Sequence, residues 1–428
     1  MNLSKDSLSH SNLKKVSDIC NIYLGGTPKT SISDFWNGDI KWATAKDVSN
    51  CQGRFIEETE KNITVKATLE SNAKIYPKGT IVITARGTVG NIAILGRPMA
   101  FNQTCYGLEV KSQIDNVYVF YCLKNLFSEI NALSYGTVFQ TITIRTFDEL
   151  LINVPPLDEQ KAIAKILSDL DSKIELNKKM NRTLEAIAQA IFKHWFIDFE
   201  FPNEEGKPYK SSGGEMVDSE LGRIPKGWEI GYLGDNLLTN IIRSGIDKFE
   251  NTKIYLDTAS VQNTNIINIK TSITYNKRPS RANMQPSYNS VWFAKMKNSK
   301  KILLFDKYAT DQINKFILST GFAGLKTTEY SLYYVFLFIS MPNFEIKKDN
   351  LCNGTTMESI NNDEIMKIKL VIPKKEVLYL FNNLIRHLYK KVYKNDLETN
   401  TLINIRDLLL PKLMTGKIRV SLEDKNDQ

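Results

Sequence analysis

The chain has 428 residues, of which 42% are hydrophobic, so it is long enough for two or three domains that each bury a core. Its formal net charge of +9 and pI near 9.0 favour an anionic partner, and nucleic acid fits better than a membrane surface, although a generally lysine-rich composition would produce the same charge. The wide spacing of the five cysteines and three histidines argues against a disulfide framework or a metal site. The N-terminus is polar and does not resemble a secretory signal, so we expect a cytoplasmic protein.

The first domain is predicted to span residues 1–156 and to have an α+β fold. Short runs rich in β-branched residues predict strands at Thr80–Thr84, Asn91–Leu95 and Leu150–Val154, separated by Gly and Pro. The loop between the first two strands is flanked by glycines and contains Arg86.

A long helix, predicted within residues 157–200, follows the first domain. Its apolar residues alternate in steps of four and three, which is typical of a coiled-coil seam. The seam residues are Ile163, Leu167, Leu170, Ile174, Leu184, Ala188, Ile191 and Trp195. Residues 201–227 are rich in Pro, Gly, Ser and charge without periodicity, so we predict a linker there.

A second α+β domain is predicted over residues 228–374. Its strands are expected at Ser290–Ala294, Lys301–Phe305 and Ser331–Ser340. The last of these contains the longest apolar stretch, which at about ten residues is half of a membrane span, so we interpret it as a buried strand. The final segment, residues 375–428, is predicted to hold a second long helix that stops at Pro411 and a tail. Its seam residues are Phe381, Ile385, Leu388, Val392, Leu402 and Leu409.

The two halves repeat one plan. GTVFQTITIRTFDELLINVPP begins at Gly136, and GTTMESINNDEIMKIKLVIPK begins 218 positions later at Gly354, an offset that the helix seams share. Such a long period predicts two pseudo-symmetric domains rather than a solenoid of small units. Asn177 and Asn395 occupy equivalent seam positions. If the helices pair antiparallel, these asparagines meet and set the register of the coil; otherwise each is a solvated break in its own helix.

The sequence contains no recognisable catalytic constellation. The segment GGTPK lacks the spacing of a P-loop, and GxSxG, HExxH and the (D/N)PP(Y/F) box of adenine methyltransferases are missing. Glu159-Gln160-Lys161 is better explained as a helix N-terminus than as a nuclease motif. We therefore expect a protein that is not itself an enzyme and that binds no cofactor.

The remaining polar clusters suit contact with double-stranded DNA. Arginine can bond guanine bidentately, asparagine and glutamine can do the same for adenine, lysine contacts phosphate, and Trp42 is a candidate for stacking on a base. In the first domain the candidates are Thr27, Lys29, Lys41, Trp42, Lys46, Arg86, Thr88, Asn91, Asn102, Gln103, Thr137 and Gln140. In the second domain they are Lys277, Arg278, Ser280, Arg281, Asn283, Lys295, Lys297, Lys326 and Thr355.

Two variable domains, each followed by a similar helix, resemble the specificity subunits of type I restriction-modification systems. The resemblance covers nearly the whole chain and is carried by GGTPKTSISDFWNGDIKWATAKDVS, YPKGTIVITARGTVGN, NVPPLDEQKAIAKILSDLDSKIELNKKMNRTLEAIAQAIFKHWF, IPKGWE and LLLPKLMTGKI. The halves differ at their loops, because Met296 stands near the position equivalent to Arg86. We expect them to read different bases.

The resemblance implies a non-catalytic reader of a bipartite DNA target. Its two domains would be target recognition domains, and its helices would pair antiparallel as a spacer. They would hold two adenine methyltransferase subunits that carry S-adenosylmethionine, and motor-nuclease subunits would join the complex. The alternatives are the specificity subunit of a split type II enzyme, an enzyme with diverged motifs, and a coiled-coil scaffold with incidental charge.

Overall fold

The computed structural model describes residues 12–51, 53–133, 141–234, 236–354 and 358–420. They form two compact units: unit 1 combines the chain up to residue 179 with the chain from residue 396 onward, and unit 2 is residues 180–395. Each of the two long helices therefore contributes one half to each unit. Within the described ranges, no helix is both long and apolar enough to cross a membrane.

Unit 1 contains an α+β domain built on two sheets. The larger sheet has the order β2-β9-β6-β7-β4, and the smaller has the order β5-β3-β8. The strands are β1 (Leu13–Lys15), β2 (Cys20–Leu24), β3 (Trp36–Ala43), β4 (Phe55–Ile56), β5 (Lys61–Ile63), β6 (Ile81–Thr84), β7 (Ile92–Leu95), β8 (Ala100–Phe101), β9 (Cys105–Val110) and β10 (Leu151–Asn153). The helices before the long helix are α1 (Val16–Ile19), η2 (Ser33–Phe35), α2 (Ala45–Asn50), α3 (Val65–Glu70), α4 (Asn116–Leu133) and α5 (Ile144–Glu149).

Unit 2 contains the second α+β domain. Its sheets have the orders β14-β23-β20-β21 and β18-β15-β22-β19, with β13-β24, β16-β17 and β11-β12 as separate pairs. The strands are β11 (Met216–Val217), β12 (Ile224–Pro225), β13 (Glu229–Tyr232), β14 (Thr239–Ile242), β15 (Lys253–Leu256), β16 (Val261–Gln262), β17 (Asn265–Ile266), β18 (Ser272–Ile273), β19 (Ala282–Met284), β20 (Ser290–Ala294), β21 (Ile302–Phe305), β22 (Phe316–Ser319), β23 (Phe322–Thr327) and β24 (Lys369–Ile372). The helices before the long helix are η3 (Thr258–Ser260), α7 (Thr310–Lys315), α8 (Leu332–Ser340), α9 (Pro342–Asn350) and α10 (Asn362–Ile365).

The two domains share their strand topology, as the repeat predicts. The order β2-β9-β6-β7 in unit 1 corresponds to β14-β23-β20-β21 in unit 2, and all these pairings are antiparallel. In the smaller sheets, β3 pairs antiparallel with β5 and parallel with β8, just as β15 pairs with β18 and β22. A tyrosine bond is also repeated, because Tyr118 donates to the carbonyl of Asn153 and Tyr334 donates to that of Val371. The domains differ in added elements, such as β4 in the first and β19 in the second.

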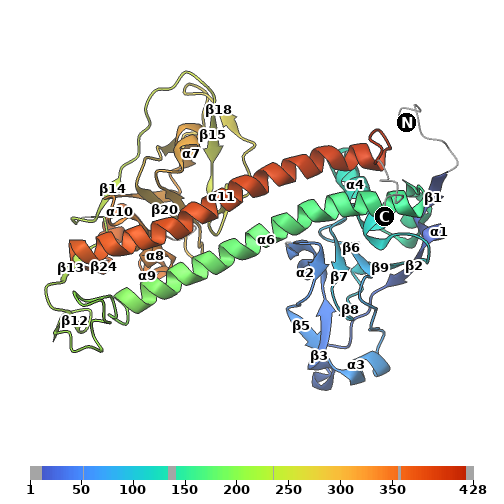
Figure 1. Cartoon of the computed structure of the whole chain (residues 1–428), viewed down its shortest axis with the longest axis horizontal. Helices are drawn as coiled ribbons and strands as arrows, with labels where there is room; N and C mark the ends of the chain where they lie inside the picture. The colour runs from blue at the N-terminus through green and yellow to red at the C-terminus, as the bar shows by residue number, and fades with distance from the viewer. Residues whose placement is uncertain (1–11, 52, 134–140, 235, 355–357, 421–428) are drawn as a thin grey trace, which may run out of the picture. The chain divides into compact units, whose positions relative to one another are not determined.

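The long helices α6 (Leu157–Phe196) and α11 (Lys375–Met414) contain 40 residues each. Figure 1 draws each as one continuous ribbon, α6 in green and α11 in red. Their starts lie 218 residues apart, and so do their ends. Pro411 does not stop α11, contrary to the sequence prediction, because proline removes only its own amide donor, and its carbonyl still accepts a bond from the amide of Thr415 at 3.1 Å. The helix ends before Gly416, whose φ of +67° suits a C-terminal cap.

Within each unit the two long helices run antiparallel. In unit 1, Arg406 bonds Asp171 while Asn177 bonds Glu398, so residue numbers fall on α11 as they rise on α6. In unit 2, Asn181 contacts Asn395 and, farther along α6, Phe192 packs near Phe381. The predicted seams are buried or half-buried.

Two further sequence predictions need correction. Residues 331–340 were expected to form a strand, but Leu332–Ser340 is helix α8, which is buried on nearly all sides. A short apolar run without alternation does not distinguish a buried strand from a buried helix. The segment 201–227, predicted as a linker, contains the pair β11-β12 and sends Phe201 and Ile224 into the core of unit 2 beside Trp228.

Candidate nucleic-acid interface

The loop between β6 and β7 presents Arg86 to solvent. Its flanking strands are buried, whereas Arg86, Gly87 and Thr88 are exposed. Gly87 has a φ of +79°, and no heavy atom lies within 4 Å of a Cβ built on it, so the turn is open. Within the described ranges, Arg86 has no hydrogen-bond or ion-pair partner. Arg86 is therefore exposed, as a DNA contact would have to be, and its role stays a prediction.

Thr88 and Asn91, two further candidates, shape this loop. The Asn91 side-chain amide donates to the carbonyl of Thr88 at 3.0 Å and to the hydroxyl of Ser49 at 3.2 Å. The hydroxyls of Ser49 and Thr88 lie 2.5 Å apart, and Thr84 also bonds the Thr88 carbonyl. Ser49, on α2, was not among the predicted residues because nothing in the sequence links it to a loop about 40 positions away. These hydrogen bonds connect the loop to β6 and to α2 and so hold its backbone in place.

Thr27 and Gln103 come together although they are far apart in sequence. The Thr27 hydroxyl donates to the Gln103 side-chain oxygen. The turn before Thr27 packs tightly, since a Cβ on Gly25 would lie 2.1 Å from the carbonyl oxygen of Asn102. The Asn102 side-chain oxygen accepts bonds from Thr104, the shorter of which is 2.7 Å. Asn102 is therefore engaged within its turn, whereas Lys29 is exposed.

Trp42 and two lysines near it do not present free contact groups. Trp42 is only 5% exposed, and its indole N–H donates to the Gly26 carbonyl at 2.9 Å. Its ring therefore packs in the core, and the base-stacking role suggested by the sequence has no exposed ring face to support it. Lys41 pairs with Glu58 at 2.5 Å, and Lys46 pairs with Glu60 at 2.7 Å. A phosphate would have to compete with these carboxylates.

In unit 2, residues 295–301 form the equivalent of the Arg86 loop. The carbonyl of Ala85 accepts a bond from the amide of Ile142, and the carbonyl of Lys295 accepts one from the amide of Ile360. Because Ile142 and Ile360 are equivalent in the repeat, Ala85 and Lys295 occupy matching positions. Met296 thus replaces Arg86, as the sequence predicts. Burial lowers the pKa of Lys295. The ammonium of Lys297 lies 2.7 Å from Glu358.

The basic segment around Arg281 has a mixed environment. Lys277, Ser280 and Arg281 are exposed, whereas the guanidinium of Arg278 lies 4.4 Å from the centre of the Tyr275 ring. The candidate Asn283 lies on β19 and is half-buried, and the exposed Lys326 donates to the carbonyl of Tyr288. Lys277, Ser280 and Arg281 are therefore the residues of this set most open to a ligand. The candidates Thr137, Gln140 and Thr355 lie outside the described residues.

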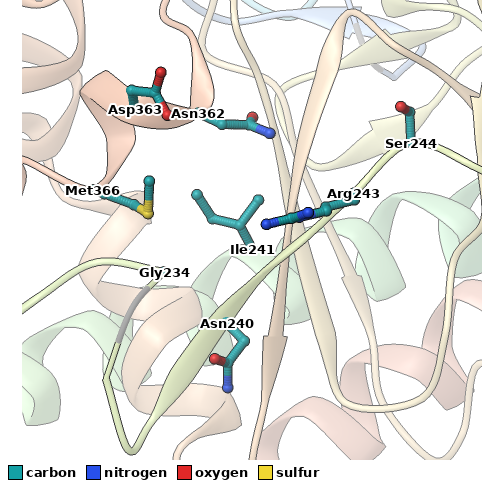
Figure 2. A pocket seen from close by; sticks show the side chains of 8 residues that line it. All are labelled: Gly234, Asn240, Ile241, Arg243, Ser244, Asn362, Asp363 and Met366. Atoms are coloured by element: carbon teal, nitrogen blue, oxygen red, sulfur yellow. The ribbon is translucent and has the colours of Figure 1, made fainter.

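A polar cleft of about 610 Å³ in unit 2 contains residues that the sequence reading missed. Its lining residues are Gly234, Asn240, Ile241, Arg243, Ser244, Asn362, Asp363 and Met366. Figure 2 shows the Arg243 side chain extending from the segment just after β14 toward Ile241, with Asn362 on the other side of the cleft. Strand pairing makes Arg243 equivalent to Leu24, just before the Gly25-Gly26 turn.

The two seam asparagines are buried in their own units. Asn177 donates to Glu398 at 2.9 Å in unit 1, and Asn395 donates to Asn181 at 2.8 Å in unit 2. Both are less than 2% exposed, so neither is a solvated break. Asn181 and Thr399, also 218 positions apart, are further buried polar residues of the helix pair. The pairing of Asn177 with Asn395 itself stays a prediction.

Comparison with known proteins identifies similar chains over nearly the full length. Residues 9–186 match the model of the type I restriction modification DNA specificity domain. The MjaIX type I specificity subunit of Methanocaldococcus jannaschii is 33% identical over 425 residues, covering 95% of this chain and 93% of that one. The HindI specificity subunit of Haemophilus influenzae is 25% identical over 352 residues, covering 67% and 73%. A crystal structure of the S subunit from M. genitalium has the same fold, with a TM-score of 0.54 at 16% identity and coverage of 95% and 98%.

Proposed function

Because the chain belongs to the family of type I restriction-modification specificity subunits, we propose that it reads a DNA target as two half-sites, one for each α+β domain. The observation that carries the proposal is the combination of shared topology and different loops. β6 and β20 have equivalent neighbours, yet one is followed by a loop with the exposed Arg86 and the other by a loop with Met296 and Lys297. Two domains with the same strand topology but different exposed loop side chains are suited to bind two half-sites of different sequence.

Exposed apolar residues on the long helices support the docking of partner subunits. Ile166 and Leu384 lie 218 positions apart, as do Ile187 and Ile405, and their exposed fractions are 37%, 43%, 42% and 41%. Ile166 and Ile405 belong to unit 1, whereas Ile187 and Leu384 belong to unit 2. Ile166 and Ile405 thus form one pair in unit 1, and Leu384 and Ile187 form the equivalent pair in unit 2. We propose that each pair binds one copy of the same methyltransferase subunit, and that motor-nuclease subunits join this complex.

Catalysis is assigned to those partners. The methyltransferase subunits would bring S-adenosylmethionine, while this chain would choose the adenines to be modified. The relatives reported above are named type I specificity subunits, which favours this assignment over the specificity subunit of a split type II enzyme.

The test is to purify the chain alone and with its methyltransferase partner, and to assay methyl transfer from labelled S-adenosylmethionine to DNA. We expect no transfer by the chain alone. The complex should methylate one target made of two short half-sites, and its affinity should fall steeply with added salt, since lysine and arginine displace counterions from phosphates. Methyl transfer by the chain alone, or modification by the complex without a bipartite preference, would contradict the proposal.

Replacing Arg86 by Ala should relax selectivity at one base pair of the half-site read by the first domain. A lost bidentate contact costs about 1 to 3 kcal/mol, or roughly 5- to 150-fold in binding. Binding to a library of targets with single changes measures the effect. Arg97→Ala is the matched control, because Arg97 is also exposed but lies 3.6 Å from Glu58 outside the loop. An equal loss for every target would instead make Arg86 a phosphate contact.

A further inference from the structure

The side chain of Lys348, on helix α9, is fully buried, unlike the exposed cations to which DNA contact is assigned above. Its ammonium donates to the carbonyls of Met296 at 3.0 Å and Ser299 at 3.3 Å, and to the carboxylate of Glu345 at 2.5 Å. Asp349 lies 3.4 Å away. Burial of an ammonium is unfavourable unless its charge is paired and its donors are bonded. Both conditions are met here, and both bonded carbonyls belong to the 295–301 loop.

The same helix holds the loop at a third point. The amide of Asn298 donates to the carboxylate of Asp349 at 3.1 Å, and Asn298 has a φ of +55°, which is an uncommon backbone conformation. Lys348 and Asp349 together therefore contact the backbone at Met296, Asn298 and Ser299. The side chains of Asn298 and Lys300 remain exposed. The support is thus on the inner side of the loop, and polar side chains are on its outer side.

The equivalent loop of unit 1 is supported in another way. Its bonds come from Thr84 on β6, from Ser49 on α2 and from its own Asn91, all of them neutral groups. The equivalent strands thus carry loops with different supports. In unit 1 the side-chain support comes from neutral groups of the sheet and α2. In unit 2 a buried charge on a helix that follows the sheet adds to the backbone bonds that Lys295 and Lys297 make with Ile360 and Glu358.

We propose that Lys348 is a positioning residue that fixes the 295–301 loop and so sets base discrimination at the half-site read by the second domain. The inference rests on the proposed function and deepens it. Lys348 does not touch DNA; it determines where the exposed side chains of the loop lie. Hydrogen bonds to base edges need a fixed geometry, whereas contacts of mobile lysines to phosphate do not. Loss of Lys348 therefore lowers discrimination more than overall affinity.

Lys348→Met tests the inference, because methionine keeps most of the side-chain volume and removes the charge. Lys347→Met is the control, since Lys347 is the exposed neighbour on the same helix. Asp349→Ala is a second variant that removes the bond to Asn298 and leaves Lys348 paired with Glu345. Each variant is assembled with the methyltransferase partner and assayed on targets with single base changes in either half-site, and amide hydrogen exchange is measured across both loops.

In Lys348→Met we expect discrimination at the second half-site to fall by about tenfold, the size of one good base contact, while the first half-site changes by less than about twofold. Amides of 295–301 should exchange faster, and those of 85–91 should not. Asp349→Ala should produce the same pattern with a smaller effect, and Lys347→Met should match the parent protein.

Three results overturn the inference: unchanged exchange in the loop, faster exchange with unchanged discrimination, or an equal loss at both half-sites, which would indicate general destabilisation. Failure of the proposed function looks different. In that case the parent complex itself shows no preference among DNA targets. Amide hydrogen exchange in residues 295–301 of the parent protein and of Lys348→Met would still show whether Lys348 holds the backbone of the loop.

Discussion

Inserting one heptad into both long helices, after Lys179 in α6 and after Asn395 in α11, should lengthen the unread stretch between the half-sites. Both positions lie where the chain passes from one unit to the other. One heptad adds roughly 10 Å at about 1.5 Å per residue, or about three base pairs of duplex, and preserves the apolar seam. The bases read in each half-site should not change, because the loops are untouched.

The original target should lose at least about 100-fold in affinity, because only one half-site can then be engaged and each mismatched base pair costs about 1 to 3 kcal/mol. Mapping modified adenines across a genome identifies the new target. An insertion of equal length at Gly213 is the control, since Gly213 is exposed and lies in the segment between α6 and the second domain. An unchanged gap in the helix variant would mean that something other than these helices measures the DNA.

Replacing Asp171 by Ala should destabilise unit 1 by about 3 kcal/mol, because it removes a buried carboxylate from Lys124 and from Arg406, although Arg406 keeps its second partner Asp407. Asp171 is 4% exposed and accepts bonds from Arg406 of α11 and Tyr121 of α4, each at 2.7 Å. Lys124 lies 3.7 Å from the same carboxylate. This one group therefore joins the first domain to both long helices within unit 1.

Asp169→Ala is the matched control two positions earlier on α6. Asp169 is exposed and, among the residues that the structure describes, pairs with Lys165 alone at the i,i+4 spacing, so its loss should cost about 0.5 kcal/mol or less. Amide hydrogen exchange in α4 measures the change in local opening free energy, and α8 in unit 2 is the internal reference. Equal effects of the two substitutions would show that the buried network contributes no more than a surface ion pair.

The Asp171 network should also make unit 1 sensitive to acid. Burial alone would raise the pKa of Asp171, but Lys124, Arg406 and the Tyr121 hydroxyl outweigh it and hold the pKa below its usual value. A carboxyl whose pKa is depressed on folding stabilises the folded state above its unfolded pKa of about 3.9, and this stabilisation is lost as pH falls through the folded value. The difference in stability between the parent protein and Asp171→Ala should therefore narrow below about pH 4.

The sequence by itself determined the features that depend on local pattern and on internal comparison. The starts of α6 and α11, the strand β20 and the position of the Arg86 loop follow from hydrophobic period and from glycine and proline placement. The offset of 218 residues predicted the shared topology, since related sequences fold alike. These signals lie within one segment, or in two segments that can be compared directly.

Only the tertiary structure decided which polar and aromatic residues face solvent. Trp42 directly follows Lys41 in a stretch that also contains Asp39 and Lys46, yet distant segments cover its ring, so it packs in the core. Lys348 follows Lys347 in a charged segment that looks exposed, and only the loop from another part of the chain makes it a buried cation. Leu332–Ser340 is a helix that is buried on nearly every side, so its sequence lacks the alternation of polar and apolar residues that would separate helix from strand. Burial is a property of neighbours distant in sequence, and residue type alone does not reveal those neighbours.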